Sequence, residues 1–210
     1  MKKLKGLFLV SLMVLLVACS NKTANLEAFY KQVDEANKVE KELVESSSKL
    51  EKLENKKLDL FNKVNKAKEI ELKGIAEDLI KNTDERKAIA DKEIKAMAKS
   101  KKLFEASKKD AKAVEDKEQK KQVEPLVSSL DDKYEKHETM MKAYQEILKK
   151  EKDLFNTLKA TPVDKNLVNE KIGAVTKLYK QFQGKTDAYT KVSRQVETNK
   201  RPIVKTLNEG

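Results

Sequence analysis

Residues 26–67 read LEAFYKQVDEANKVEKELVESSSKLEKLENKKLDLFNKVNKA, and this stretch decides the fold class. Its apolar residues recur mostly three or four positions apart, or at sums of these steps, at Leu26, Tyr30, Val33, Ala36, Leu43, Leu50, Leu53, Phe61, Val64 and Ala67. Charged residues of both signs fill many of the positions between them. Because this spacing lines one face of an α-helix, the stretch predicts one long helix with an apolar stripe. At 1.5 Å per residue, about 45 residues would reach nearly 70 Å.

Helical spacing continues through the rest of the chain, for example from Leu126 to Leu158 and from Leu167 to Val196. The chain is rich in Ala, Glu, Lys and Leu, which are strong helix formers. Its five glycines and three prolines are too few for the turns of a multi-stranded sheet. We therefore expect an all-α protein, an elongated antiparallel helical bundle or coiled coil of three to four long helices.

Breaks between helices are expected where glycine, proline and capping residues occur. Gly74 and Asn82–Glu85 are the first candidates, and Thr83 would cap a new helix. Residues 108–122 contain few large apolar side chains and suggest a hairpin tip or a frayed helix end. Pro125 would then lie in the first turn of the next helix, where its missing N–H costs nothing.

The clearest expected boundary is Ala160-Thr161-Pro162, where Thr161 would cap the last helix and Asp164 would favour its positive dipole end. That helix should stop before Pro202. The sequence thus predicts a helical domain over residues 25–201 and a frayed tail over residues 202–210.

The N-terminus has the three parts of a signal peptide. Lys2, Lys3 and Lys5 form a positively charged start, and Leu7–Val17 is apolar except for one serine. A run of this length is shorter than the roughly 20 residues that a membrane-spanning helix needs. We therefore expect residues 1–18 to be removed on export.

Leu16-Val17-Ala18-Cys19 resembles the lipobox of bacterial lipoproteins, and Cys19 is the chain's one cysteine. The resemblance implies cleavage after Ala18 and a covalent diacylglyceryl group on Cys19. Two or more acyl chains give stable membrane anchoring, whereas one chain is marginal. Residues 19–24 would then be a short lipidated tether. The alternatives are an ordinary signal peptide with a chance cysteine and a plain N-terminal anchor.

Signatures of enzymes and metal sites are absent from the sequence. His137 is the one histidine, so no Cys/His metal site can be assembled, and we read it as solvated or at the edge of a seam. Asp131-Asp132 and Glu115-Asp116 are neighbouring carboxylates, but adjacent helical residues point roughly 100° apart. We expect a non-enzymatic protein with no metal and no cofactor beyond the lipid.

Positive charge is concentrated near the C-terminus. The chain carries a formal charge of +11, and residues 165–205 carry +7 of it. Within a roughly 120° sector of the last helix lie the candidate anion-binding residues Lys165, Lys177, Lys180, Lys191 and Arg194. Such a face either binds polyanions or only keeps the rod soluble. Nucleic acid is not the expected partner, because export removes the protein from the genome and arginines are scarce.

With its lipobox, its Lys/Glu-rich helices and its size, the chain resembles the YkyA-type family of cell-wall-binding lipoproteins of Gram-positive bacteria. The resemblance implies association with the cell wall and supplies no catalytic residue.

We expect a lipoprotein on the extracellular face of the membrane that binds an anionic wall polymer such as teichoic acid, or otherwise associates with the wall. The alternative is a scaffold or adaptor whose apolar helical seam engages another envelope protein. A solute-capture protein is disfavoured because no sheet is expected, and a wall hydrolase because no acid/base pair or metal site is evident.

Overall fold

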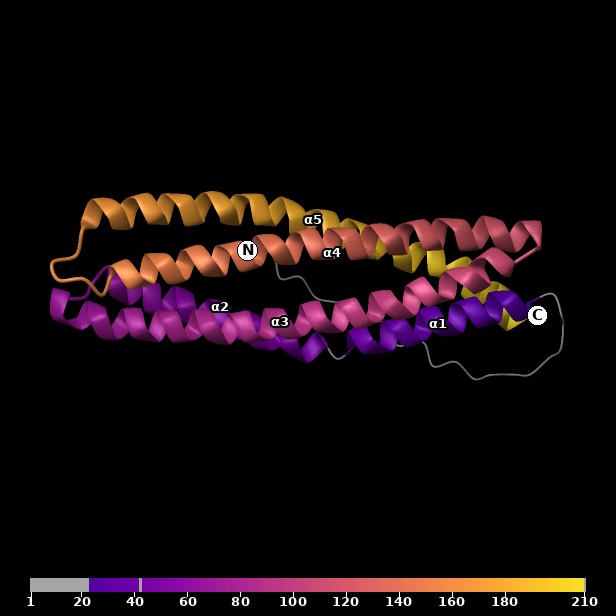
Figure 1. Ribbon diagram of the computed structural model, residues 1–210, viewed down its shortest axis with the longest axis horizontal. Coiled ribbons are helices and arrows are strands. Elements are labelled where there is room, and N and C mark those ends of the chain that lie inside the picture. The colour runs from indigo at the N-terminus through magenta and orange to yellow at the C-terminus, as the bar shows by residue number, and fades with distance from the viewer. Residues whose placement is uncertain (1–22, 42, 210) are drawn as a thin grey trace.

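The computed structural model describes residues 23–41 and 43–209, and the long segments among them are helical. In this part of the chain five helices follow one another: α1 (Ala24–Lys41), α2 (Leu43–Val64), α3 (Glu69–Ala113), α4 (Lys117–Thr157) and α5 (Lys165–Glu209). α1 and α2 lie one after the other along α3, and the direction reverses at each turn, giving a rod of four antiparallel arms (Figure 1). α3 and α5 have 45 residues each, a length of about 68 Å. The predicted elongated antiparallel bundle is confirmed.

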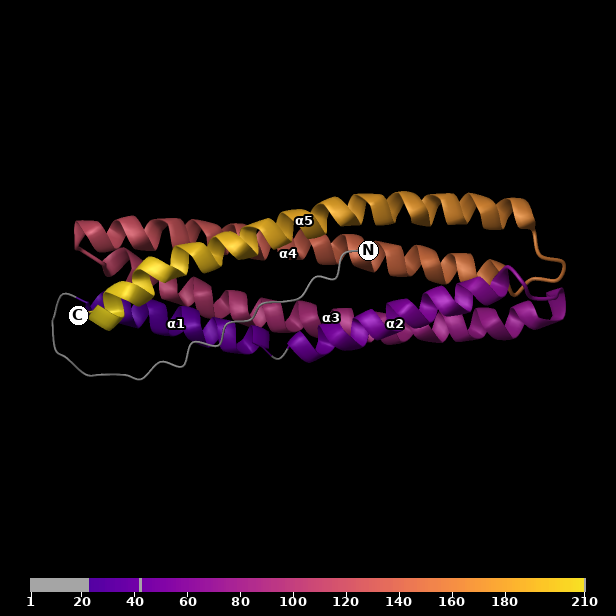
Figure 2. The ribbon, with the colours of Figure 1, turned by 180° about the vertical axis from the view of Figure 1, so that it is seen from behind.

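The first arm holds α1 and α2 along the stretch for which we predicted one helix. α1 ends at Lys41 and α2 begins at Leu43, and residue 42 between them lies outside the described residues. α2 ends at Val64, three residues before the predicted end. Both helices pack on α3, as the view from behind also shows (Figure 2).

The start of α3 differs from the prediction. The turn before it lies at residues 65–68, whereas Gly74 and Asn82–Glu85 are inside the helix, so both predicted interruptions are wrong. Thr83 is buried and its Oγ1 donates to the carbonyl of Leu79 at 2.9 Å instead of capping a helix. Burial of this face keeps the backbone helical where local sequence alone suggested a stop.

The hairpin between α3 and α4 falls inside the predicted segment 108–122, with its turn at residues 114–116. Asp116 caps α4, since its Oδ1 accepts from the backbone N–H groups of the second and third helical residues at 2.9 and 3.0 Å. Because the helix starts at this cap, Pro125 lies inside α4 and not in its first turn, where we had expected it.

The predicted boundary at Ala160-Thr161-Pro162 lies in the connection between α4 and α5 and is confirmed. The capping residue is Asp164, however, and not Thr161. The Oδ1 of Asp164 accepts from the backbone N–H groups of Asn166 and Leu167 at 2.9 and 3.1 Å.

The last helix does not stop before Pro202, so the expected end of the helical domain at residue 201 and the frayed tail over residues 202–210 are wrong. α5 continues through Pro202 to Glu209. Ile203 is 0% exposed, and burying a side chain of this size is worth about 1.5–3 kcal/mol. This burial offsets much of the roughly 3 kcal/mol that proline costs inside a helix.

The core consists of three apolar clusters along the rod. The first lies at the end where α1 begins and includes Leu26, Phe29, Val33, Phe104, Leu126 and Ile203. The opposite end is filled by Leu60, Leu79, Leu154, Phe155, Leu158 and Val175. Between them lie Ala90, Met140, Met141, Tyr144 and Leu148. The apolar stripes read from the sequence are thus the seams that hold the arms together.

Candidate functional site

The five basic residues predicted on the last helix all lie on α5 with exposed side chains. They are Lys165, Lys177, Lys180, Lys191 and Arg194. In the described part of the chain, none of the five forms an ion pair within 4 Å. The opposite side of the helix is buried at Val175, Val196 and Ile203. Since α5 packs with that apolar side inward, the basic side faces solvent along the rod.

Two further cations of α5, which were not among the five predicted residues, extend this surface, and one of them, Lys205, follows Pro202. Arg201 and Lys205 are exposed, and at 100° per residue they fall in the same roughly 120° sector as Arg194. The signal was the apolar spacing of Val196, Ile203 and Leu207, which continues across the proline. We call the surface formed by the five predicted residues together with Arg201 and Lys205 the α5 basic face.

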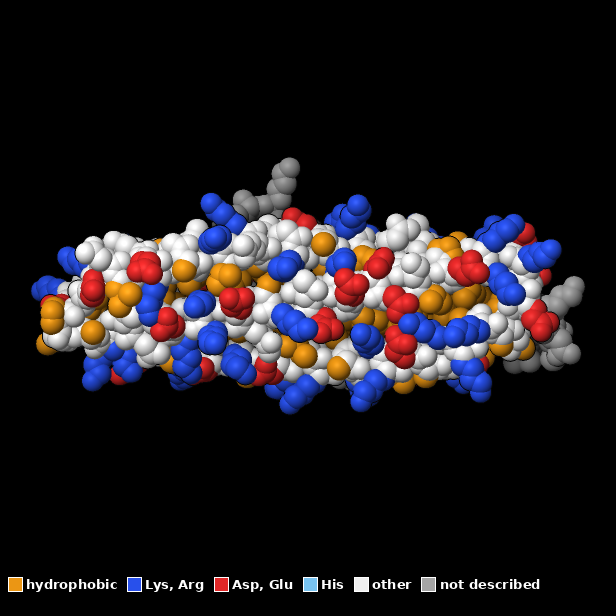
Figure 3. Space-filling view, turned by 45° about the horizontal axis from the view of Figure 1, so that its top comes forward, with side chains coloured by type: hydrophobic (Ala, Val, Ile, Leu, Met, Phe, Trp, Pro, Cys, Tyr) orange, Lys and Arg blue, Asp and Glu red, His pale blue; other side chains and the backbone are white. Residues whose placement is uncertain are grey.

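The α5 basic face is not uniformly positive. Asp187 and Glu209 fall in the same sector; Asp187 accepts a hydrogen bond from Gln183 at 2.9 Å, and Glu209 lies 3.8 Å from Lys205. Lysine and arginine side chains nevertheless project along the length of the rod, as the space-filling view shows (Figure 3). Seven cations with two carboxylates over about 60 Å make a surface suited to an extended anion.

A second group of charged residues lies in the interior of the rod. Arg86 is 0% exposed and bridges two carboxylates, with its Nη1 2.8 Å from Glu54 and its Nη2 bonded to Glu151. Lys57 contacts the same two carboxylates at 2.6 and 3.2 Å. We call these four residues the core charge cluster. It joins α2, α3 and α4, and the hydroxyl of Tyr179 joins α5 to it by donating to Glu151 at 2.8 Å.

Neighbouring opposite charges favour the ionised forms of Glu54 and Arg86 in the core charge cluster. Burial alone would raise the pKa of Glu54, but the charges of Arg86 and Lys57 hold this pKa below its ordinary value. Burial would lower the pKa of Arg86, but Glu151 and Glu54 raise it. Both shifts favour the charged forms of Glu54 and Arg86, and the ion pairs of the cluster tie α2, α3 and α4 together. The signal for it was the presence of an arginine in a lysine-dominated chain, because arginine is favoured in buried ion pairs.

The remaining candidates from the sequence have structural positions. His137 is 3% exposed, its Nε2 lies 2.9 Å from Glu93, and its ring meets the edge of Tyr189. It is therefore inside the seam between α3, α4 and α5 and not solvated. Of the neighbouring carboxylates, Asp131 accepts from Lys108, and Asp116 caps α4. In the described ranges, no three potential metal ligands come together.

Cys19 and the signal peptide lie outside the described residues. Of the predicted tether, Thr23 and Ala24 are described, and Ala24 is already the first residue of α1. The start of α1, the α3–α4 turn and the end of α5 lie at one end of the rod (Figure 1). There Asn25 donates to the carbonyl of Ala113 at 2.7 Å. We call this the tether end. None of the helices in the described ranges is long and apolar enough to cross a membrane.

The chain is similar to known proteins in sequence and in fold. The family model YkyA, described as "Putative cell-wall binding lipoprotein", matches residues 24–206. An uncharacterized lipoprotein YkyA from Bacillus subtilis is 24% identical over 176 residues, which is 79% of each chain. The crystal structure of a conserved protein of unknown function from Staphylococcus aureus has a TM-score of 0.69 and 28% identity, covering 90% of this chain and 97% of that one.

Proposed function

The chain belongs to the YkyA family, and on this premise we propose that it is a non-enzymatic lipoprotein, anchored outside the cell through Cys19, whose α5 basic face binds an anionic cell-wall polymer. The observation that carries the proposal is the row of exposed cations on α5. Six of the seven have no ion-pair partner within 4 Å among the described residues, and Lys205 has only a long, exposed contact.

Anchoring at Cys19 supports a definite orientation. Diacylglyceryl on the thiol and the tether that follows would hold the tether end of the rod near the headgroups, because six extended residues reach only roughly 20 Å. The α5 basic face runs from Lys205 at the tether end to Lys165 near the other end, about 60 Å away. A polymer that crosses the space outside the membrane would therefore meet cations along most of the rod.

The apolar seams give less support to a scaffold. Their residues are used to pack the arms against one another. Among the described residues, the large apolar side chains that are exposed are Leu58, Ile70 and Leu167. Each is on a different helix, so they do not continue one seam that a partner helix could occupy.

The proposal is tested with isolated cell walls and the soluble form that begins at residue 20. Walls should retain the protein at low salt and release it as salt rises, because salt screens exposed charges. Charge reversal of Lys177, Lys180, Lys191 and Arg194 to Glu should weaken retention strongly.

The matched control reverses four exposed lysines that lie on other helices and, among the described residues, form no ion pair within 4 Å: Lys73, Lys92, Lys149 and Lys150. It changes the net charge by the same amount, so it should weaken retention much less. Equal loss in both variants would mean that net charge matters and the α5 basic face does not. Absence of retention at any salt concentration would count against wall binding itself.

A further inference from the structure

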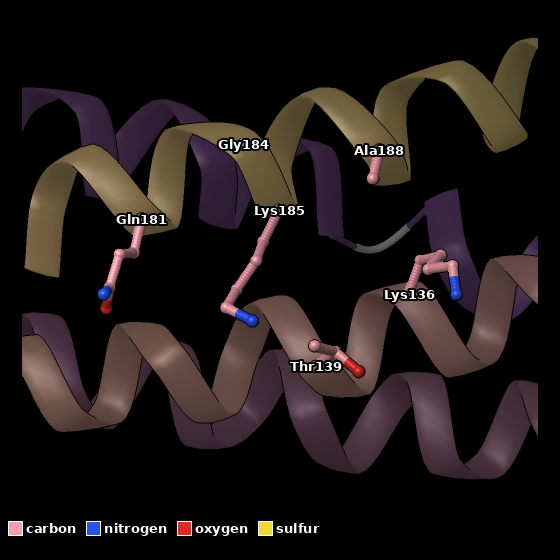
Figure 4. A pocket seen from close by; sticks show the side chains of 6 residues that line it. All are labelled: Lys136, Thr139, Gln181, Gly184, Lys185 and Ala188. Carbon is pink, nitrogen blue, oxygen red and sulfur yellow. The ribbon is translucent and has the colours of Figure 1, made fainter.

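A groove lies between α4 and α5 beside the α5 basic face. It has a volume of about 490 Å³, and its lining residues are Lys136, Thr139, Gln181, Gly184, Lys185 and Ala188 (Figure 4). This volume is within the usual range for small-molecule sites. The hollow exists because α5 presents two small residues on successive turns, Gly184 and Ala188. A Cβ added at Gly184 would meet no atom within 4 Å.

The lining is positively charged and rich in free donors. It contains two lysines and no carboxylate. Lys185 extends from α5 toward Thr139 on α4 (Figure 4) and forms no ion pair within 4 Å in the described part of the chain. Lys136 Nζ has one carboxylate partner there, the neighbouring Glu135 at 2.8 Å. An anion would therefore meet ammonium groups from both helices without displacing a buried ion pair.

The groove opens at the edge of the α5 basic face. Lys180 lies one turn before Gly184, and Lys191 lies two turns after it. Both lysines are exposed. A polyanion lying along α5 would therefore pass the mouth of the groove.

We propose that this groove is a phosphate subsite, which seats one phosphodiester group of the polymer together with its adjoining polyol. The inference rests on the proposed function and deepens it. Lys136 and Lys185 neutralise the phosphate oxygens from opposite helices, and Thr139 and Gln181 donate to those oxygens or to adjacent hydroxyls. Lysine ammonium groups bind phosphate as point charges, so a tetrahedral anion with several oxygens can be contacted by donors from several directions at once.

The first test compares a defined poly(glycerol phosphate) with polyglutamate, a carboxylate polymer of similar charge, as ligands of the full mature chain. The variant Lys136→Gln/Lys185→Gln should bind poly(glycerol phosphate) roughly a hundredfold more weakly, because it loses two charge-assisted hydrogen bonds and each is worth about tenfold. Its binding to polyglutamate should change no more than that of the control Lys149→Gln/Lys150→Gln. Equal losses for the two polymers, or equal losses in the two variants, would overturn the subsite.

The second test fills the groove without changing charge. Gly184→Leu should weaken binding of poly(glycerol phosphate), whereas Gly173→Leu should not. Gly173 is also exposed on α5, and a Cβ there also meets no atom within 4 Å. Both variants should fold, because leucine is a better helix former than glycine. Equal binding by the two variants would overturn the subsite.

Three further results distinguish failure of the subsite from failure of the proposed function. If vesicles of anionic phospholipid compete as well as poly(glycerol phosphate), the subsite is supported and its phosphate comes from headgroups. If reversal of the α5 basic face abolishes binding while both groove variants behave as their controls, the subsite is wrong and wall binding through α5 stands. If the wild-type chain does not bind walls, the proposed function fails, and binding of poly(glycerol phosphate) in solution then decides the subsite by itself.

Discussion

Replacing Arg86 by methionine removes the guanidinium that holds Glu54 and Glu151 in the interior of the rod. Arg86 is 0% exposed and Glu151 is 2% exposed, so water cannot replace the lost partner. Breaking a buried ion pair from one side costs about 3–5 kcal/mol, because a charge is left uncompensated. Lys57 still contacts both carboxylates, which places the expected cost near the lower end. For a chain of this size, that cost corresponds to a loss of roughly 6–12 °C in Tm.

The assay is urea denaturation at pH 7, followed by circular dichroism, for the wild type, Arg86→Met, Glu151→Leu and the double variant. The double variant leaves Glu54 paired with Lys57, so it should be more stable than Arg86→Met alone. A cost below about 1 kcal/mol for Arg86→Met, or additive effects in the double variant, would refute the core charge cluster as a structural tie.

The pH dependence gives an independent check on the same cluster. The pKa of Glu54 is held below its ordinary value of 4.5 in the folded protein. Its contribution to stability is therefore present above that value and is lost as the pH falls through the lower, folded pKa. Arg86→Met removes the main cause of this lowering, so the difference in stability between the wild type and the variant should narrow in acid. A difference that stays constant from pH 7 to acid would contradict this reasoning.

Further predictions concern other parts of the rod. Burial, reinforced by nearby carboxylates, raises the pKa of Tyr30 from 10.0 to about 12. The contribution of the neutral Tyr30 side chain to folding stability is therefore present below pH 10 and lost as the pH rises through about 12. Tyrosinate absorbance and the helical circular dichroism signal should change together near that pH. Asp164→Ala removes the acceptor of two N–H groups of α5 and should cost about 1 kcal/mol in urea denaturation, whereas an unchanged midpoint would exclude a capping role. Gly184→Ala and Gly173→Ala should each stabilise the protein by up to about 1 kcal/mol, since neither new Cβ meets an atom within 4 Å; a lower Tm would contradict the open surroundings of these glycines.

The sequence predicted what depends on apolar spacing and missed what depends on contacts between distant segments. The seams through Leu26, Leu126 and Val175 lie where their periodicity placed them. Gly74 and Pro202 failed as helix breaks because tertiary burial of the same helices outweighs a local cost of about 1 kcal/mol for glycine and 3 kcal/mol for proline. Because the sequence-based prediction ended the last helix before Pro202, it left out the end of α5 and with it Lys205 of the candidate site.

The core charge cluster could not be predicted from the sequence for a different reason. Glu54 and Lys57 are spaced as an ordinary i,i+3 surface pair, and nothing in their local sequence marks them as buried. Only the register of α2, α3 and α4 brings them to Arg86 and Glu151. The groove beside α5 is likewise a product of register, because Lys136 and Lys185 come from helices whose alignment the sequence did not specify.

The proposed anchoring at Cys19 would determine where the α5 basic face lies relative to the membrane, and it is tested most directly by mass spectrometry of the protein purified from its native envelope. We predict an N-terminal peptide that begins at Cys19 and carries a thioether-linked diacylglyceryl group. An N-terminal peptide with an unmodified Cys19 thiol, or one that still begins at Met1, would contradict the lipid-anchored orientation.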